Sequence, residues 1–212
     1  MEYLQTVNDL IQRGKSKEIQ LAVSEALSAG VSAADILNKA MIPAMGVIGT
    51  KFKSGEIFVP EVLIAARAMN RGAEILRPAL LKEGVKPIGK AVICTVKGDL
   101  HDVGKNLVKM MLEGVGIECI DIGVDVDGSK VIQAIKSSGA TLVCLSALLT
   151  TTMINQKEII DALIVAGIRD KVKVMVGGAP LTQEFADKIG ADAYTADAAS
   201  AAEIAQSFCL KY

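Results

Sequence analysis

Residues 91–106 read AVICTVKGDLHDVGKN, and this stretch decides the fold of the second half of the chain. Its first six residues form a short apolar run of strand length, which ends at Lys97 and Gly98. Residues 103–115 then have the length and composition of a helix. The stretch therefore predicts a buried strand, a loop and a helix, and the only histidine of the chain, His101, lies in the loop.

The same alternation continues to the C-terminal end of the sequence. Further apolar runs occupy residues 117–122, 141–146, 172–176 and 191–195, and segments of helix length lie near 103–115, 128–138, 153–166, 181–189 and 198–209. Strands that are apolar on both faces belong to a parallel sheet covered by helices on two sides. We therefore predict an α/β domain with a five-stranded parallel sheet, doubly wound in the flavodoxin-like (Rossmann-like) manner.

The first 83 residues have a helical period instead. Apolar residues recur at helical spacing over 3–12, over about 16–29 and again beyond Ser32. Pro43 is expected to kink or restart the third helix, and Pro60 suits the first turn of a fourth. Four helices with short connections predict a small all-α bundle.

These patterns divide the chain into three parts. We expect a helical bundle over residues 1–83, a polar linker over 84–90 and an α/β domain over 91–212.

Composition excludes several classes of function. The 23 Lys and Arg residues against 24 Asp and Glu give a net charge of -1, which argues against nucleic acid as a partner. The N-terminus lacks the basic start and continuous apolar run of a signal peptide, and no apolar stretch reaches the roughly 18 residues of a membrane helix. The four cysteines form no C-x-x-C pair, so neither a disulfide framework nor a zinc site is expected. We expect a cytoplasmic protein that does not bind membranes.

The loops after four of the predicted strands meet at one edge of such a sheet, where doubly wound domains bind ligands. They carry GDLHDVGKN from Gly98, SALLTTTM from Ser146, GGAP from Gly177 and YTAD from Tyr194. Small and hydroxylated residues dominate, so this edge suits a bulky ligand that lies close to the backbone.

Asp99 and His101 are two residues apart, which lets the carboxylate reach one ring nitrogen while the other faces outward. A histidine that ligates a metal often has such a partner, although a hydrogen-bonded loop histidine has the same pattern. The glycine-containing turn could instead hold a phosphate, but it matches no phosphate-binding motif. One histidine without nearby cysteines leaves too few ligands for a simple zinc or iron site. A metal that carries its other ligands in a macrocycle needs only one residue from the protein.

Three motifs together resemble a known family. The sequence contains D-x-H-x-x-G (Asp99, His101, Gly104), S-x-L (Ser146, Leu148) and G-G (Gly177, Gly178). This set is similar to the signature of cobalamin-binding domains. Residues 45–63, MGVIGTKFKSGEIFVPEVL, also resemble the helical cap of methyl-transfer cobalamin proteins. The resemblance covers nearly the whole chain, and the chain length matches the small corrinoid proteins of three-component methyltransferase systems.

The resemblance implies a role for each of these residues. His101 would replace the benzimidazole of the cofactor as the lower cobalt ligand, Asp99 would hold His101, and Thr152 stands where methionine synthases use serine. The displaced nucleotide tail would pass Ser146, Leu148, Thr150, Gly177, Gly178 and Tyr194. Further contacts with the cofactor are expected from Gly98, Leu100, Asp102, Val103, Gly104 and Ala196. Met45, Phe52 and Val59 would cover the methyl face of the corrin, although apolar residues at this spacing also suit a bundle core.

The function that follows from the resemblance is methyl transport. The cofactor would be cobalamin, as methylcobalamin or cob(I)alamin, and the partners would be a substrate-specific methyltransferase, an acceptor methyltransferase and a reductive activase. The chain itself would be a carrier without an active site of its own. Alternative readings are a subunit of an adenosylcobalamin mutase, a cobalamin-sensing regulator or a storage protein. The sequence leaves open whether the methyl donor is methanol, a methylamine, a betaine or an aryl methyl ether.

Overall fold

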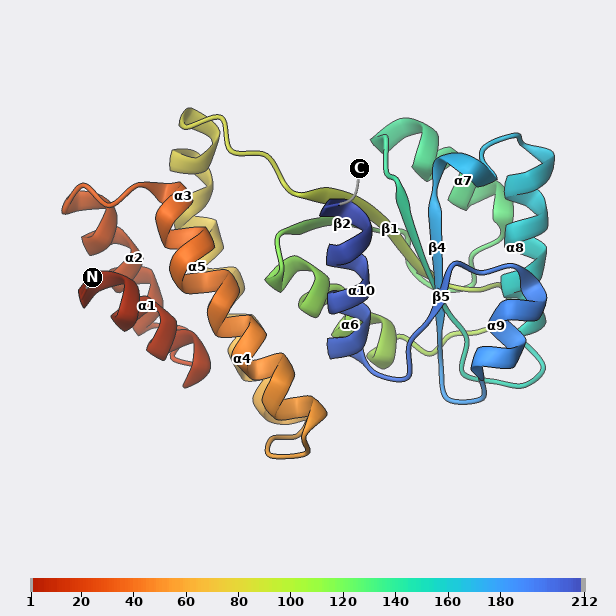
Figure 1. The fold of residues 1–212 in the computed structure, drawn as a ribbon, viewed down its shortest axis with the longest axis horizontal. Helices are drawn as coiled ribbons and strands as arrows, with labels where there is room; N and C mark the ends of the chain where they lie inside the picture. The colour runs from red at the N-terminus through yellow and green to blue at the C-terminus, as the bar shows by residue number, and fades with distance from the viewer. Residues whose placement is uncertain (1, 211–212) are drawn as a thin grey trace. The chain divides into compact units, whose positions relative to one another are not determined.

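The computed structural model describes residues 2–210 (Figure 1). The chain forms two compact units. The first runs to Pro87 and includes Gly114–Gly116, and the second comprises Ile88–Glu113 and the chain from Ile117 onward. Among the described residues, no helix is long and apolar enough to cross a membrane.

The first unit is helical. Its elements are α1 (Glu2–Gln12), α2 (Glu18–Ser28), α3 (Ala33–Ile36), a π-helical turn (Leu37–Met41), α4 (Ile42–Lys53) and α5 (Val59–Lys82). Apolar side chains from α1, α2, α4 and α5, among them Ile11, Ile19, Met45 and Leu76, are fully buried. The predicted helical bundle is confirmed, with α3, the π turn and α4 forming one continuous third segment.

Pro43 produces a wider turn in this third segment. Proline has no amide hydrogen, so the ordinary bond to the carbonyl four residues earlier cannot form. The backbone instead makes a π-helical turn just before it, in which the Ile42 amide donates to the Leu37 carbonyl. The Asn8 side-chain amide donates to the Ala40 carbonyl at 2.9 Å and satisfies a further acceptor of this turn. The helix therefore continues through the proline.

The second unit is the predicted α/β domain. Its parallel strands are β1 (Gly89–Thr95), β2 (Ile117–Asp121), β3 (Leu142–Ser146), β4 (Lys173–Gly177) and β5 (Ala193–Tyr194), in the order β2-β1-β3-β4-β5. The helices are α6 (Val103–Gly114), α7 (Gly128–Ser138), α8 (Ile154–Val165), a 3-10 turn (Arg169–Lys171), α9 (Gln183–Ile189) and α10 (Ala198–Leu210). The predicted doubly wound sheet of five parallel strands is confirmed.

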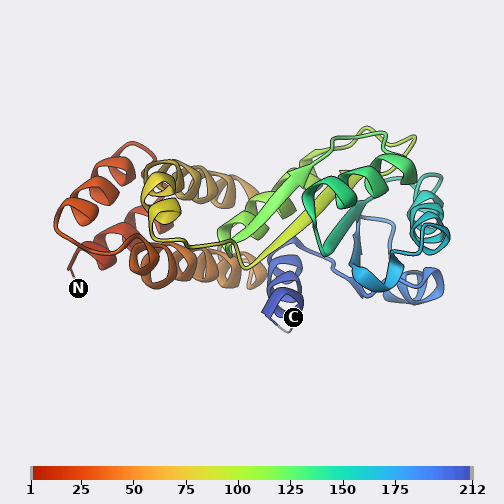
Figure 2. The same ribbon diagram turned by 90° about the horizontal axis from the view of Figure 1, so that it is seen from above.

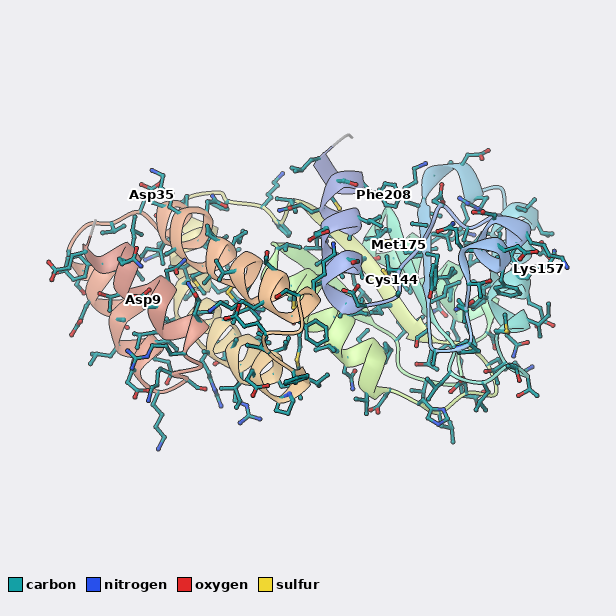
Figure 3. The ribbon with its side chains drawn as sticks, turned by 60° about the horizontal axis from the view of Figure 1, so that its bottom comes forward. Asp9, Asp35, Cys144, Lys157, Met175 and Phe208 are labelled. Atoms are coloured by element: carbon teal, nitrogen blue, oxygen red, sulfur yellow. The ribbon has the colours of Figure 1, made fainter. Side chains whose placement is uncertain are left out.

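Helices cover both faces of the sheet, with α6 and α10 on one face and α7, α8 and α9 on the other (Figures 1 and 2). Val92, Val143 and Val174 pack with the apolar sides of α7 and α8 in one core. Cys144 and Met175 lie on the opposite face beside Phe208 of α10 (Figure 3). The cysteines are free thiols, and burial raises the pKa of Cys94 and of Cys119 to about 12. They are therefore protonated at neutral pH.

The strand order reverses at β1, because the chain moves outward to β2 and then returns to the other side of β1 as β3. In such sheets the ligand crevice forms at the carboxyl ends of the strands that flank this reversal. The register aligns the strand ends, since Thr95 pairs with Ser146 and Ser146 pairs with Gly177. The loops that follow β1, β3 and β4 therefore begin side by side.

Candidate cofactor-binding site

Every residue predicted to bind the cofactor lies at this carboxyl edge of the sheet. The connection from β1 to α6 carries Gly98, Asp99, Leu100, His101 and Asp102, and Val103 and Gly104 begin α6. Ser146 ends β3, and Leu148, Thr150 and Thr152 lie between β3 and α8. Gly177 ends β4, Gly178 follows it, Tyr194 ends β5 and Ala196 lies just beyond. Hydrogen bonds join the first of these loops to the second, whereas Thr150 and Ala196 are exposed on the same edge.

The His101 imidazole is held on one side and open on the other. Its Nδ1 lies 2.8 Å from Oδ1 of Asp99, and its backbone amide donates to the same oxygen at 3.1 Å. Because an ionised carboxylate only accepts hydrogen bonds, Nδ1 is the donor, and in the neutral imidazole Nε2 then carries the free lone pair. The imidazole is 52% exposed, and no described residue forms a hydrogen bond with Nε2. The ring is therefore oriented and has one nitrogen free to bind a metal.

The Asp99 carboxylate is itself immobilised. Its side chain is fully buried, and its Oδ2 accepts hydrogen bonds from the Leu148 amide and from the Thr152 hydroxyl, each at 2.7 Å. Burial alone would raise the pKa of this carboxyl. The hydrogen bonds from Leu148, Thr152 and His101 outweigh burial and hold the pKa of Asp99 well below its usual range. Asp99 is therefore ionised and presents a fixed negative charge to the imidazole.

Thr152 connects the two loops through one hydroxyl group. Its Oγ1 lies 2.7 Å from Asp99 Oδ2 and 3.0 Å from the Leu149 carbonyl oxygen. The hydroxyl has a single proton and two acceptors, and the ionised carboxylate is the stronger and nearer of them. Thr152 thus binds Oδ2 of Asp99, whereas the imidazole binds Oδ1 of the same carboxylate.

Sequence reasoning missed other residues that hold this loop. The Thr95 hydroxyl donates to the His101 carbonyl at 2.8 Å, the Asn155 side-chain amide donates to the Lys97 carbonyl at 2.6 Å, and Asp125 accepts from the Gly98 amide at 2.7 Å. The one available signal was Thr95, a polar residue at the end of an apolar run. Nothing in the local sequence pairs Asn155 or Asp125 with a loop that lies 27 or more residues away.

Two glycines at this edge have different surroundings. Gly178 has φ +136°, and a Cβ there would overlap the carbonyl oxygen of Ala147, so the loops after β3 and β4 are in direct backbone contact. A Cβ at Gly104 would meet no atom within 4 Å, so the start of α6 faces open space. A ligand at this edge can approach the backbone of α6 closely.

The surroundings of His101 fit a large ring with apolar edges. Exposed apolar side chains lie in the same two loops as the imidazole and at the start of α6: Leu100, Val103, Leu148 and Leu149. Such side chains are costly to leave in water and favour a ligand that covers them. The described residues contain no group of three or more His, Cys, Asp or Glu side chains that could hold a metal ion. The residues present fit a metal bound through His101 alone, inside a macrocycle.

A buried polar atom lies next to the same edge. The Gln156 side-chain amide donates to the carbonyls of Leu145 and Gly177, at 3.0 and 3.3 Å, which fixes its orientation. Its Oε1 is buried and has no hydrogen-bond partner among the described residues. Gln156 therefore ties the end of β3 to the end of β4.

A doubly wound sheet that presents an aspartate-held imidazole at its switch point fits the class that the sequence motifs resemble, the corrinoid-binding domains. Comparisons with known proteins agree. Residues 89–205 match a family model described as a B12 binding domain, and residues 3–77 match a second model with the same description. The chain belongs to this B12-binding family, and cobalamin or a closely related corrinoid is its cofactor.

The relatives are named corrinoid proteins. The chain is 44% identical to trimethylamine corrinoid protein 1 of Methanosarcina acetivorans over 172 residues, which is 80% of each chain. It is 41% identical to dimethylamine corrinoid protein 2 of the same organism, over 99% of this chain and 97% of the relative.

Solved structures agree with this assignment. The methanol:cobalamin methyltransferase complex of Methanosarcina barkeri contains a chain that matches all of this one, with 81% of that chain covered, a TM-score of 0.87 and 31% identity. A cobalamin-binding protein of Desulfitobacterium hafniense DCB-2 matches 97% of this chain and 98% of its own, with a TM-score of 0.81 and 30% identity.

The three residues predicted to cover the methyl face lie in the helical unit. Met45 of α4 is fully buried, and Phe52 of α4 and Val59 of α5 are partly buried on either side of the K-S-G-E turn. The burial of Met45 is compatible with a place in the bundle core and does not test its contact with the cofactor. Contact of Met45, Phe52 and Val59 with the cofactor stays a prediction.

Proposed function

We propose that this chain carries a methyl group on corrinoid cobalt between two methyltransferases. The observation that supports this most strongly is the free Nε2 of His101, because its Nδ1 is held by a buried and ionised Asp99. An imidazole prepared in this way can replace the nucleotide base of the cofactor as the lower ligand of cobalt.

When bound, cobalamin supplies a cobalt centre that accepts and gives up a methyl group. The residues of the chain control the lower side of that centre. Asp99 orients His101 through a hydrogen bond of 2.8 Å between its Oδ1 and the ring Nδ1. Thr152 and the Leu148 amide fix Asp99 in turn, so His101 would bind the metal with little loss of side-chain freedom.

The other loops would hold the nucleotide tail that His101 displaces. Ser146 and Gly177 are paired strand ends in the sheet register, Leu148 and Gly178 lie in the loops that follow them, and Tyr194 ends the next strand. Gly178 permits backbone contact between two of these loops. Gly98, Leu100, Asp102, Val103, Gly104, Thr150 and Ala196 would complete the contacts with the corrin and its tail, and Met45, Phe52 and Val59 would shield the methyl face.

The proposed partners follow from the relatives. Those relatives are named for trimethylamine, dimethylamine and monomethylamine, and a structural neighbour belongs to a methanol:cobalamin methyltransferase complex. We propose a small methylated compound, with methylamines first, as the source of the methyl group. A substrate-specific methyltransferase would load the chain, an acceptor methyltransferase would unload it, and a reductive activase would restore the cobalt. The chain would supply no active site of its own.

The test is methyl transfer on the isolated chain. The protein is reconstituted with cobalamin, reduced, and mixed with each methylamine and the methyltransferase encoded beside its gene. We expect rapid methylation of bound cobalamin with one donor and its removal by an acceptor enzyme. A chain that binds cobalamin through His101 but is never methylated by any donor and methyltransferase pair would be a store, and the carrier proposal would be wrong.

A further inference from the structure

Asp125 has an unusual backbone conformation. It lies in the loop between β2 and α7, and it is the one described residue other than glycine with a positive φ, +54°. The left-handed region is unfavourable for residues with a Cβ, although Asp and Asn tolerate it better than others. A residue kept in this conformation usually serves a local purpose.

The contacts of Asp125 show what the conformation achieves. The Gly98 amide donates to Asp125 Oδ1 at 2.7 Å, and the Asp125 amide donates to the Asp99 carbonyl at 3.1 Å. One residue thus forms hydrogen bonds with two consecutive residues of the β1–α6 loop, through its side chain and its backbone. Gly98 itself has φ +78°, so both partners are in the left-handed region at this contact.

The two bonds hold the residues that precede His101 in the same loop. Asp99, whose carbonyl Asp125 binds, uses its carboxylate to orient His101. Other bonds fix the loop at its ends, from Asn155 to the Lys97 carbonyl and from Thr95 to the His101 carbonyl. Asp125 alone, among the described residues, binds the backbone of both Gly98 and Asp99 from a neighbouring loop.

We infer that Asp125 is a positioning residue for the cobalt ligand: it fixes the loop that carries Asp99 and so sets the place of the His101 imidazole. The inference rests on the proposed lower-ligand role of His101. Without the two bonds, the loop would populate conformations in which His101 cannot reach the metal, and the fraction of competent molecules would fall.

The experiment uses cobinamide, a corrinoid without a nucleotide tail, on the full-length protein. Only the protein can then supply a nitrogen ligand from below, and electron paramagnetic resonance of the cobalt(II) form measures the ratio of nitrogen-bound to nitrogen-free cobalt at saturating protein. Three variants separate backbone conformation from hydrogen bonding. Asp125→Asn keeps both the acceptor oxygen and tolerance of a positive φ. Asp125→Gly loses the acceptor oxygen but keeps the φ, and with it the backbone amide that donates to Asp99. Asp125→Ala loses the oxygen and disfavours the φ that positions this amide.

We expect Asp125→Asn to retain the wild-type ratio within about twofold, and Asp125→Gly to lower it about threefold to tenfold, the usual worth of one hydrogen bond. Asp125→Ala should lower the ratio further. Asp127→Ala is the matched control: Asp127 caps α7 through the amides of Ser129 and Lys130 and, in the described part of the chain, forms no hydrogen bond with the histidine loop. That variant should lose thermal stability and keep the wild-type ratio.

Two results would overturn the inference. One is a wild-type ratio in Asp125→Gly and Asp125→Ala, whatever their thermal stability. The other is an equal loss in Asp127→Ala, which would make the effect one of general stability. If the wild-type protein itself shows no nitrogen ligation that His101→Ala removes, the lower-ligand proposal fails, and this result is distinct from either of the two.

Discussion

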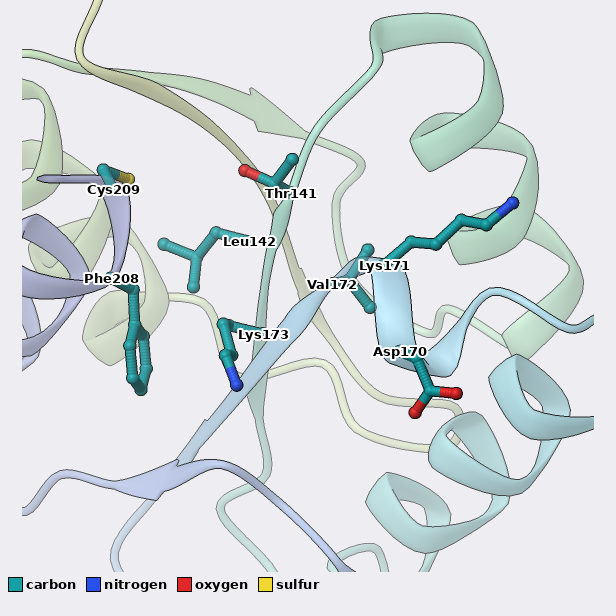
Figure 4. Close-up of a pocket in the computed structure, with 8 residues that line it drawn as sticks. All are labelled: Thr141, Leu142, Asp170, Lys171, Val172, Lys173, Phe208 and Cys209. Atoms are coloured by element: carbon teal, nitrogen blue, oxygen red, sulfur yellow. The ribbon is translucent and has the colours of Figure 1, made fainter. Parts of the chain in front are cut away.

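The two edges of one sheet differ in how they are built. At the amino end of β3 and β4, a cavity of about 90 Å³ is lined by Thr141, Leu142, Asp170, Lys171, Val172, Lys173, Phe208 and Cys209 (Figure 4). At the carboxyl end, an imidazole stands exposed above a carboxylate that accepts four hydrogen bonds. The amino edge has a cavity, whereas the carboxyl edge has polar groups that orient one another through hydrogen bonds.

This difference teaches that a hollow alone does not mark the functional site. Leu142, Val172 and Phe208 supply apolar lining to the cavity at the amino edge. Among its charged lining residues, Asp170 and Lys171 are exposed and Lys173 is partly buried. The Lys173 ammonium nitrogen lies over the Phe208 ring, 5.8 Å from the ring centre. At the carboxyl edge a chain of contacts runs from Thr152 through Asp99 to His101 and ends in a free nitrogen. The oriented groups at the carboxyl edge therefore mark the candidate functional site, and the cavity does not.

The largest effect is expected at His101. His101→Ala should remove nitrogen ligation of bound cobalamin by the protein completely, because the chain has no second imidazole. The measurement is the absorption and paramagnetic resonance spectrum of the reconstituted variant. A wild-type spectrum in this variant would contradict the assignment of the carboxyl edge.

The next effect is on stability at the carboxyl end of β2. Asp121 binds the ammonium of Lys105, which is 3% exposed, at 2.7 Å. Asp121→Asn leaves this ammonium buried without a charged partner, with Asn106 Oδ1 still accepting from it at 2.8 Å. We therefore expect a loss of about 3 kcal/mol in the free energy of unfolding at pH 7. Asp161→Asn removes an exposed pair with Lys157 (Figure 3) and should cost less than about 1 kcal/mol.

Asp121→Asn should also change how the stability of the protein responds to acid. Burial would raise the pKa of Asp121, but hydrogen bonds from Lys105 and Gly123 and the charges of Lys105 and Lys109 lower it on balance. The folded pKa thus lies below the unfolded value of about 4, so the stabilisation is complete above that value and is lost as pH falls toward the folded pKa. Urea unfolding at pH 7, 5 and 3.5 should show a steeper loss for wild type than for Asp121→Asn. Parallel pH curves would contradict this.

A smaller effect is expected at Asp99. Asp99→Ala removes the partner that orients His101, and loss of such a partner typically costs about 10-fold to 100-fold in metal affinity. Titration with cobinamide measures this directly, because binding then depends on the imidazole and the corrin face alone. An unchanged affinity would show that the Asp99 carboxylate stabilises the loop and does not affect metal binding by His101.

The smallest effect is expected at the amino edge. Phe208→Ala removes a partly buried ring beside the cavity and should lower the free energy of unfolding by about 1 to 2 kcal/mol. Cobalamin affinity and nitrogen ligation should stay at the wild-type level, as measured by the same titration. A tenfold loss of affinity would mean that the two edges are not independent and that the cavity takes part in binding.

The sequence predicted what depends on short-range pattern. Apolar runs located the five strands to within about two residues, and strand order placed the loops with His101, Ser146 and Gly177 at one edge. The pairing of Asp99 with His101 was readable because the two residues are neighbours in the chain. The roles of these residues as cofactor contacts stay predictions.

Long-range partners were not predictable in this way. Asp125 meets Gly98 from 27 residues away, and the Glu83 carboxylate accepts from the amides of Ala33 and Ala34 at the start of α3, about 50 residues away. Such bonds depend on where a loop is placed by the whole fold, which no local spacing encodes. The π-helical turn before Pro43 is similar, because the choice between a break and a wider turn depends on packing of the third helical segment in the bundle.

The most direct test of the central claim uses the single histidine. Protein grown with 15N-labelled histidine carries the label at His101 alone, and bound cobalamin is reduced to cobalt(II) for paramagnetic resonance. If His101 ligates the metal, the nitrogen splitting changes from a triplet in unlabelled protein to a doublet in labelled protein. A triplet that persists in the labelled protein would mean that the cofactor keeps its own base, and the account given for this edge of the sheet would be wrong.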